Sequence, residues 1–341
     1  MAHPSSQVQT RPTITRSEAA VALARWWDLE GDLEDLPSER DRNFLVRDAG
    51  GRPAFVFKVA NLDEDFAFLE CQHEAMTRLA AAGLPVQPVR RAFDGTDIIG
   101  LGNPGPPWAR VLGWLPGRVL AAIEAPDLAL WTDLGATMGR SATALLDFDH
   151  PAARRAIQWD VLLAGAVIAS GIDDVDDGVR AGLLAAVAAR LRQDLVPRLP
   201  SLRRSVIHND ANDHNVVVDE TGLRVAGLLD FGDLVHSVTA QEVAVACAYA
   251  MLDRADPAAV MQRIVAGFDS TCPLTADELV ALPSLIFARL GASVAISALQ
   301  SRLAPDPYLR VSEEPAWALL TWFEATPGSA LRIAVREAVD R

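Results

Sequence analysis

A short predicted hairpin with a polar loop at each of its open ends is the feature that most constrains how this chain can fold. The β-like segments 215–218 and 223–229 are joined by 219–222, whose sequence Asp-Glu-Thr-Gly favours a tight turn. One polar loop, 208–215, leads into the hairpin, and another, 230–233, follows it. Because both free ends of a hairpin lie at the same edge, we expect the two loops to lie side by side.

The side chains of these two loops are of the types that phosphoryl transfer requires. The first loop reads His208-x-Asp210-x4-Asn215, and Asp230 follows twenty residues after Asp210. Phosphoryl transfer needs a carboxylate that accepts the proton of the attacking hydroxyl, and oxygen ligands that hold magnesium on the phosphates. We therefore expect Asp210 to be the catalytic base, and Asn215 and Asp230 to bind Mg²⁺. His208 is expected to pack or hydrogen-bond so that it fixes the loop.

Two other interpretations of these residues remain open. One is a metal-dependent hydrolase using His208, Asp210 and His214, because imidazole and carboxylate both bind zinc, although no further cluster of His and Asp completes such a site. The other is a catalytically silent nucleotide-binding scaffold, which the loss of the base or of a magnesium ligand would favour. Since Asp210, Asn215 and Asp230 are all present, we favour a kinase.

Lys58 is the only lysine among the 31 basic residues of the chain. An ammonium is a compact point charge and a guanidinium a broad planar fork, so a site that needs the compact charge keeps lysine. Lys58 lies near the end of the predicted strand 54–59, from which it can reach nucleotide phosphates, steadied by a carboxylate on a helix. Glu70 and Glu74 lie one turn apart on the next predicted helix, 66–82, and the sequence does not choose between them.

The element pattern changes along the chain and predicts an α+β protein of two lobes. Residues 1–16 lack periodicity and are expected to form a flexible tail, followed by a small, mostly β N-terminal lobe over 17–112. A larger helical C-terminal lobe is expected over 113–341, in which the hairpin is the only β signal and 235–341 consists of packed helices. The elements expected in the N-terminal lobe are helices at 17–27 and 66–82 and strands at 43–46, 54–59, 86–92, 97–101 and 108–114.

The formal net charge of -14 restricts the partners of this protein. Nucleic-acid binders need a basic face that displaces counterions from phosphates, so DNA and RNA are not expected partners. A nucleotide can still bind if magnesium and a few local cations neutralise its phosphates. An acidic protein also favours a cationic second substrate, which indicates an amine-bearing acceptor.

The cysteines and the hydropathy pattern predict a cytoplasmic protein. Cys71, Cys247 and Cys272 are an odd number without paired spacing, which suits reduced thiols. No uncharged stretch approaches the ~18 residues that a membrane-spanning helix needs. The first twenty residues lack the apolar core of a signal peptide, so no membrane association is expected.

The two loops and several further phrases resemble the aminoglycoside phosphotransferase and choline kinase superfamily, whose fold resembles that of the eukaryotic protein kinases. The resemblance spans 35–251 and is strongest to the hydroxylysine kinase group. It implies a bilobal protein-kinase-like fold, ATP or GTP as donor, and a small amino alcohol or hydroxylated amino acid such as hydroxylysine as acceptor. The phrases that carry the resemblance are Leu36-Pro-Ser-Glu-Arg-Asp-Arg-Asn-Phe44, Trp114-Leu-Pro-Gly117, Asn212-Asp-His-Asn215 and Leu229-Asp-Phe-Gly-Asp-Leu234.

The resemblance also implies how the phosphates are held. The segment from Ser38 to Asn43 would form the loop over the phosphates, and Lys58 would contact them. This loop departs from a glycine-rich pattern, so main-chain amides of a Ser/Asp-rich turn would have to cradle the phosphate. In the catalytic loop, Asn209 stands where the superfamily often has glycine, and asparagine tolerates a left-handed backbone better than other non-glycine residues.

Purine and acceptor contacts are implied in the same way. The segment from Val111 to Leu115, which includes Trp114, would be the hinge that holds the purine. The acceptor would approach from the helical lobe, where Asp233 or Glu242 could bind a cationic amine. Both carboxylates could equally be helix caps or charges at the edge of the core.

Overall fold

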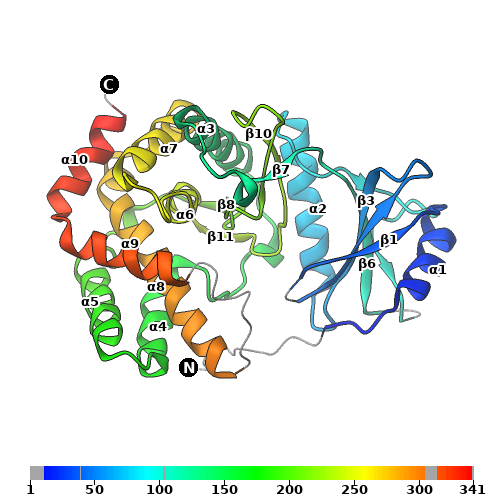
Figure 1. The fold of residues 1–341 in the computed structure, drawn as a ribbon, viewed down its shortest axis with the longest axis horizontal. Helices are drawn as coiled ribbons and strands as arrows, with labels where there is room; N and C mark the ends of the chain where they lie inside the picture. The colour runs from blue at the N-terminus through cyan, green and yellow to red at the C-terminus, as the bar shows by residue number, and fades with distance from the viewer. Residues whose placement is uncertain (1–10, 39, 103–104, 304–312, 340–341) are drawn as a thin grey trace. The chain divides into compact units, whose positions relative to one another are not determined.

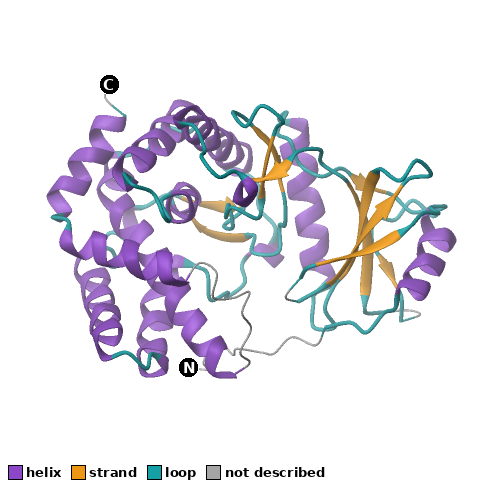
Figure 2. Ribbon diagram, viewed as in Figure 1, coloured by secondary structure: helices purple, strands orange, loops and turns teal. Residues whose placement is uncertain are grey.

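The structure, a computed structural model, describes residues 11–38, 40–102, 105–303 and 313–339 (Figure 1). The chain divides into two compact units, Met1–Pro116 and Gly117–Arg341. The first unit is rich in strands and the second is mostly helical (Figure 2). The α+β class expected from the sequence is therefore confirmed, whereas most of the expected tail, residues 1–10, lies outside the described residues.

A six-stranded antiparallel sheet with a helix on each face forms the first unit. Its elements are α1 (Arg16–Trp27), β1 (Leu33–Leu36), β2 (Arg42–Arg47), β3 (Pro53–Val59), α2 (Phe66–Ala81), β4 (Val89–Arg90), β5 (Ile99–Gly100) and β6 (Trp108–Gly113). The strand order is β1-β2-β3-β6-β4, with β5 also paired to β6. Phe57 and Val111 lie on the face that packs against α1, in a shared apolar core. Lys58 and Arg110 therefore lie on the opposite face, where Arg110 contacts α2 through Gln72.

Local sequence signals explain where the two helices of the first unit begin and end. Thr15 caps α1 in a capping box with Glu18, and Asp65 caps α2 by accepting the N–H of Ala67. Gly83 ends the α2 region with a left-handed φ of +77°. The expected helices and the expected strands at 43–46, 54–59 and 108–114 are confirmed to within one residue at each end.

Three short strands of the first unit differ from the sequence-based expectation. Only Val89–Arg90 and Ile99–Gly100 pair in the sheet, so the strands expected over 86–92 and 97–101 are too long. Strand β1 was not expected, and it pairs along its whole length with β2. Short edge strands of this kind carry weak hydrophobic patterns, which explains both errors.

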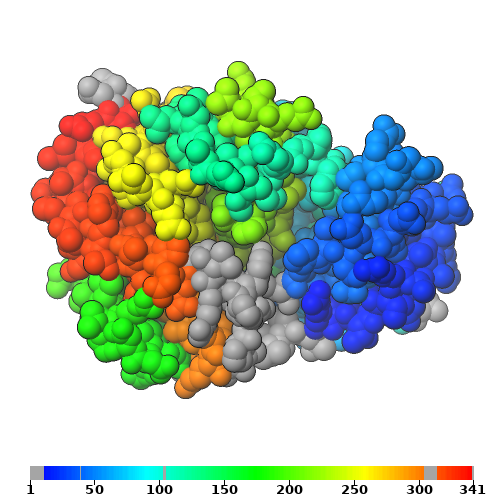
Figure 3. Space-filling model, viewed as in Figure 1, coloured from blue at the N-terminus to red at the C-terminus, as the bar shows by residue number. Residues whose placement is uncertain are grey.

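Helices form most of the second unit, and they pack closely where glycines allow it. The helices are α3 (Leu128–Leu145), α4 (Val161–Gly171), α5 (Gly178–Asp194), α6 (Gln241–Ala250), α7 (Pro257–Thr271), α8 (Ala276–Leu303), α9 (Glu313–Ala325) and α10 (Gly328–Ala338). A Cβ atom on Gly135 of α3 would lie 2.0 Å from the carbonyl oxygen of Ile264, and one on Gly267 of α7 would lie 2.0 Å from that of Thr132. The two glycines therefore let α3 and α7 approach at backbone contact. On the outer side of the unit, α7 and α10 lie side by side (yellow and red in Figure 3).

The second unit contains more β structure than the sequence predicted. Besides the expected hairpin of β9 (Val216–Val218) and β10 (Val225–Leu228), β8 (Arg204–Ile207) pairs with β11 (Val235–Val238). A two-residue strand, β7 (Arg118–Val119), pairs with β9. The expectations that the hairpin is the only β structure after 113 and that 235–341 is entirely helical are therefore wrong.

One described helix is long and apolar enough to cross a membrane by length and composition. This helix is α8, over Ala276–Arg302, and 78% of its most apolar window is buried inside the protein. Arg289 interrupts the apolar stretch of this helix, so the helix contains no uncharged run of ~18 residues. A mostly buried helix of this kind is typical of a protein core.

Candidate active site

The topology of the second unit places the two predicted polar loops together. Strand β8 leads into loop 208–215 and β11 follows loop 229–234, and these strands pair with Ile207 opposite Val235. At the hairpin, Val216 lies opposite Leu228. The N–H of Leu229 donates to the carbonyl oxygen of Asn215 at 2.8 Å, which joins the two loops directly. The expected adjacency of the loops is therefore confirmed.

Asp210 is held by three side chains that each donate to its carboxylate. Asn212 Nδ2 lies 3.1 Å from both carboxylate oxygens. Asn215 Nδ2 donates to Oδ2 at 2.6 Å, and Arg289 Nη2 donates to Oδ1 at 3.1 Å. A carboxylate fixed by several donors has one orientation, which is the condition for a base that must meet a substrate hydroxyl.

The electrostatic surroundings of Asp210 raise the pKa of its carboxyl to about 6. Burial is the largest cause, because it penalises the charged form, and the nearby carboxylate of Asp233 acts in the same direction. The charge of Arg289 and the His208 ring oppose this shift. The carboxyl therefore lies between acidic and basic neighbours whose effects on its pKa partly cancel.

His208 connects the two loops through its ring. Its Nδ1 accepts the N–H of Asp210 at 3.2 Å, and its Nε2 lies 2.9 Å from the carbonyl oxygen of Leu229. A neutral imidazole protonated on Nε2 satisfies both hydrogen bonds. The ring is fully buried and meets Phe231 edge-on, with the ring centroids 4.6 Å apart. These contacts match the loop-fixing position expected for His208.

The carboxylate of Glu242, at the start of α6, holds the main chain of loop 208–215. Glu242 is 1% exposed, and its two carboxylate oxygens accept the N–H groups of His208 and Asn209 at 3.1 and 2.9 Å. Both oxygens thus accept main-chain N–H groups in the interior, which fits the structural alternative for Glu242 better than the contact with the acceptor amine. This geometry is that of a residue that positions the loop.

Asn209 occupies the left-handed backbone conformation that its position in the loop suggested, with φ of +67°. Its side chain is fully buried and accepts a hydrogen bond from Gln241 Nε2 at 2.6 Å. Its Nδ2 donates to the carbonyl oxygen of Asp233 at 3.3 Å. Asparagine therefore supplies two hydrogen bonds at a position where glycine would supply only the backbone conformation.

Asn215 and Asp230 lie where a divalent cation could be held. The amide nitrogen of Asn215 is used by Asp210, which leaves its amide oxygen as the atom suited to a cation. Asp230 is exposed, has a left-handed φ of +50°, and directly follows Leu229, which is bonded to Asn215. Magnesium is usually bound through one or two protein oxygens together with phosphate and water, so these two residues fit it.

The described residues offer no support for the zinc hydrolase alternative. Among them there is no group of three His, Cys, Asp or Glu side chains that could hold a metal ion. Both ring nitrogens of His208 are already in hydrogen-bond contacts, and His214 is exposed.

The first unit carries the residues expected to meet the nucleotide. Lys58 is 6% exposed and lies opposite Asn43 on β2 and Arg110 on β6, so the three side chains share one face of the sheet. Ser38 Oγ accepts the N–H of Asp41 at 3.1 Å within the predicted phosphate loop. Residue 39 of that loop lies outside the described residues.

The helix carboxylates expected near Lys58 point elsewhere on α2. Glu70 and Glu74 are both exposed, whereas the buried polar side chains of α2 are Gln72 and His73. Arg110 Nη2 donates to Gln72 Oε1 at 2.6 Å. The helix face that meets the sheet therefore presents an amide and an imidazole, and the choice between the two glutamates stays open.

The predicted hinge residues differ in their exposure. Val111 is fully buried in the core beneath α1, so its side chain is not available to a purine. Trp114 is half-buried, and its main-chain N–H donates to the carbonyl oxygen of Ala54 at 2.9 Å.

Asp233, one of the two carboxylates expected near the acceptor, is 6% exposed and belongs to the second loop.

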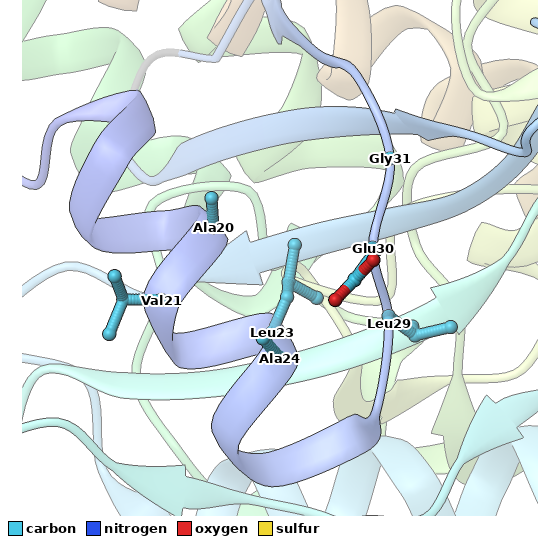
Figure 4. Close-up of a pocket in the computed structure, with 7 residues that line it drawn as sticks. All are labelled: Ala20, Val21, Leu23, Ala24, Leu29, Glu30 and Gly31. Carbon is cyan, nitrogen blue, oxygen red and sulfur yellow. The ribbon is translucent and has the colours of Figure 1, made fainter.

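A hollow of about 310 Å³ lies in the first unit between α1 and the segment after it (Figure 4). It contains none of the residues predicted for the site. Its lining is apolar except for Glu30, and it is formed by Ala20, Val21, Leu23, Ala24, Leu29, Glu30 and Gly31.

Arg289 is the residue of this site that sequence reasoning missed. It lies on α8, far along the chain from the loop whose Asp210 it contacts. A signal was present in the sequence, because Arg289 is the only charged residue between Glu278 and Arg302. A lone charge in a buried apolar helix needs a partner, and such charges are frequently functional.

The architecture defines the class of this protein, a phosphotransferase of the protein-kinase-like fold. A strand-rich first unit precedes a larger helical unit, whose paired loops carry a carboxylate held by three side-chain donors. The chain belongs to the APH phosphotransferase enzyme family, whose model matches residues 32–279.

Curated relatives extend over almost the whole chain. Hydroxylysine kinase from Mus musculus is 28% identical over 339 residues, which cover 92% of this chain and 90% of that protein. Hydroxylysine kinase from Danio rerio is 28% identical over 315 residues and covers 86% of each chain. The chain is thus similar to hydroxylysine kinases in sequence.

Solved structures share the fold at lower identity. A microcompartment-associated aminopropanol kinase superimposes with a TM-score of 0.68 at 19% identity, over 95% of this chain and 99% of that chain. Amicoumacin kinase, solved with AMP-PNP and Ca²⁺, superimposes with a TM-score of 0.65 at 15% identity, over 94% of each chain. The expected protein-kinase-like fold is therefore confirmed.

Proposed function

We propose that this small-molecule kinase transfers the γ-phosphoryl group of ATP or GTP to a hydroxyl of a small amino alcohol or hydroxylated amino acid, of the hydroxylysine type. The proposal rests on one observation above others. Asp210 is fixed by Asn212, Asn215 and Arg289, and Asn215 is bonded through its main chain to the loop that begins with Asp230. This arrangement supports a role for Asp210 as a base next to oxygens that would hold a metal–phosphate group.

In this proposal each residue of the second unit has a separate task. Asp210 orients the acceptor hydroxyl and takes its proton as the oxygen attacks phosphorus. The Asn215 amide oxygen and the Asp230 carboxylate would hold Mg²⁺, which when bound neutralises charge on the phosphates. His208 and Glu242 keep the loop in place through the ring and main-chain hydrogen bonds described above.

The residues of the first unit are proposed to bind the nucleotide. Lys58 supplies a compact positive charge for the phosphates, and Asn43, its neighbour across β2 and β3, lies on the same sheet face. The side-chain oxygen of Asn43 is buried without a hydrogen-bond partner among the described residues, so a donor on a ligand would satisfy it.

The net charge of the protein supports an amine-bearing acceptor. The free cysteines support a location in a reducing compartment. The net charge of -14 favours a cationic acceptor, and Asp233 is the carboxylate next to Asp210 that is suited to bind an amine. The three cysteines are free and buried, which fits the cytoplasm.

Nucleotide turnover with a panel of acceptors tests the proposal. ATP and GTP are supplied separately with Mg²⁺, and the acceptors are hydroxylysine, aminopropanol, ethanolamine and an aminoglycoside. Acceptor-dependent turnover is expected, and Asp210→Asn should reduce kcat by about 10²- to 10⁴-fold because general base catalysis is lost. Asp213→Asn removes a carboxylate from the same loop without touching Asp210 and serves as the matched control.

The outcomes separate the alternatives. Nucleotide binding without turnover of any acceptor, in both the unaltered protein and the variants, would identify a silent scaffold. Absence of nucleotide binding would overturn the kinase assignment. Equal losses in Asp210→Asn and Asp213→Asn would remove Asp210 from its proposed role.

A further inference from the structure

Arg289 is a buried charge placed directly beside the proposed base. It is 5% exposed and lies on α8, in a stretch of that helix between Glu278 and Arg302 whose other residues are uncharged. Removing a charged group from water is costly unless its hydrogen-bonding atoms are satisfied by the protein or by a ligand. The position of Arg289 therefore needs an explanation in terms of its contacts.

One of the three nitrogens of the guanidinium, Nη2, has hydrogen-bond partners in the protein. Nη2 donates to Asp210 Oδ1 at 3.1 Å and to the hydroxyl of Tyr249 at 3.2 Å. The guanidinium carbon lies 4.3 Å from the ring centroid of Trp159 and 5.3 Å from that of Tyr249, which is cation–π distance for both rings. The aromatic rings stabilise the charge but accept none of its remaining hydrogen atoms in a conventional hydrogen bond.

The other two nitrogens of the guanidinium have no acceptor among the described residues. Nε and Nη1 are both buried and meet no hydrogen-bond partner within the described part of the chain. Native proteins satisfy nearly all such groups, so two unpaired donors on one buried cation indicate a missing hydrogen-bond acceptor. A carboxylate is a suitable partner, because its planar pair of oxygens matches the guanidinium donors.

We infer that Arg289 binds the carboxylate of the acceptor and so makes this enzyme a kinase of hydroxylated amino acids rather than of amino alcohols. The inference rests on the proposed function and narrows its acceptor class. Since Arg289 also contacts Asp210, a carboxylate held by its free nitrogens lies a few bonds away from the hydroxyl that Asp210 receives. An amino alcohol lacks the carboxylate and would leave Nε and Nη1 of Arg289 without an acceptor.

The arrangement around Asp210 favours the acceptor over the nucleotide as the source of the anion. Asn215, which is proposed to hold the metal and its phosphates, donates to Oδ2 of Asp210. Arg289 donates to the other oxygen, Oδ1. In the proposed function the metal and the phosphates would be held on the Oδ2 side through Asn215, which leaves the second substrate as the ligand that would meet Arg289 on the Oδ1 side.

A pair of acceptors that differ only in the carboxylate tests this inference. The acceptors are 5-hydroxylysine and its decarboxylated counterpart, 1,5-diaminopentan-2-ol, each assayed with the unaltered full chain. We expect kcat/KM to be roughly 10- to 100-fold higher for hydroxylysine, the effect of hydrogen bonds to a charged group. This comparison needs no variant, so a failure of a variant to fold does not affect it.

Arg289→Gln and Arg289→Lys then assign the preference to this residue. A loss shared by both acceptors reports the contact with Asp210, whereas a loss of the preference between them reports the carboxylate contact. We expect Arg289→Gln to reduce the preference to within about threefold of unity, mainly through a higher KM for hydroxylysine, and Arg289→Lys to keep part of it because the charge remains. Arg190→Gln is the matched control, because Arg190 stacks on Phe287 of the same unit and contacts neither Asp210 nor Trp159.

Equal turnover of the two acceptors by the unaltered protein would overturn the inference and leave the kinase assignment intact. An Arg289→Gln variant that keeps the preference, or that instead raises the KM for the nucleotide, would also overturn it, the latter by assigning Arg289 to the phosphates. Failure of every acceptor in the panel would refute the proposed function itself, and this outcome is distinct from a wrong acceptor class.

Discussion

Asn209 in loop 208–215 combines an unusual backbone conformation with buried side-chain hydrogen bonds. Its backbone is left-handed, and its buried side chain is bonded to Gln241 and to the main chain of Asp233. The left-handed conformation costs non-glycine residues about 1–2 kcal/mol of conformational free energy. For asparagine this cost is smaller than for most residues, because its short amide can hydrogen-bond locally. The loop is therefore stabilised at this position both by backbone tolerance and by side-chain contacts.

Two substitutions at Asn209 separate these contributions. Asn209→Ala and Asn209→Gly lose the same side-chain hydrogen bonds, but only alanine adds strain at a φ of +67°. We expect Asn209→Gly to be the more stable of the two by about 1 kcal/mol, as measured by the free energy of unfolding in urea at constant m. Equal stability, or a more stable alanine variant, would show that the left-handed backbone is not maintained in solution.

At the residue scale, the sequence predicted the loop residues but not their partners from distant segments. Asp210, Asn215 and Asp230 lie within one hairpin and its loops, so their spacing alone placed them together. Arg289 and Glu242 reach the same loop from α8 and α6, and only the tertiary packing of those helices brings them there. Burial, which turns Glu242 from a plausible substrate contact into a loop support, is likewise a property of the packed structure.

At the scale of elements, pattern strength decided which strands could be predicted. The hairpin of β9 and β10 has a clear turn and a run of valines, and it was predicted with its turn. Strands β8 and β11 are four residues each and pair over a sequence distance that no local signal reports. The missed pair is nevertheless what brings the second loop back beside the first.

Helix α2 carries a second feature that the sequence did not reveal, the buried imidazole of His73. It is 4% exposed, and burial together with the nearby charge of Arg110 lowers the pKa of His73 to about 3. Both ring nitrogens lack a hydrogen-bond partner among the described residues. The folded protein therefore holds this ring neutral between about pH 6.5 and pH 3, where an exposed histidine would be protonated.

This pKa predicts that the protein already loses stability at pH values above the usual pKa of a carboxyl group, which is about 4. Between pH 6.5 and 3 the unfolded chain takes up a proton on His73 that the folded protein does not, so the free energy of unfolding falls as the pH falls. The loss attributable to His73 should reach about 2 kcal/mol on going from pH 6.5 to pH 5, at 1.36 kcal/mol for each pH unit.

Urea unfolding of the unaltered protein and of His73→Leu at pH 7, 6 and 5 measures this contribution. The variant should lose less stability on acidification, because it has no proton to take up at this position. His214→Gln, which replaces an exposed histidine, is the control and should follow the unaltered protein. Parallel curves for the unaltered protein and His73→Leu would show that His73 is not held neutral.

At the scale of the whole molecule, net charge connects the composition with the proposed acceptor. A charge of -14 creates a negative potential around the protein that attracts cations and repels anions, and salt screens both effects over a Debye length of ~10 Å at 0.1 M. A hydroxylysine molecule carries a net positive charge at neutral pH, whereas the nucleotide is an anion. The two substrates should therefore respond to salt in opposite directions.

We expect kcat/KM for hydroxylysine to fall by about 3- to 10-fold between 0.05 and 0.5 M KCl, with kcat nearly constant, because screening weakens encounter and binding but not the chemical step. Homoserine, a hydroxylated amino acid without net charge, is the control acceptor and should show a smaller change. The KM for the nucleotide should fall or stay constant over the same range, because salt relieves its repulsion from the protein. A fall in kcat/KM that is equal for the charged and the neutral acceptor would show that the acidic composition does not select the amine, and the preference for a cationic acceptor would then have to come from Asp233 alone.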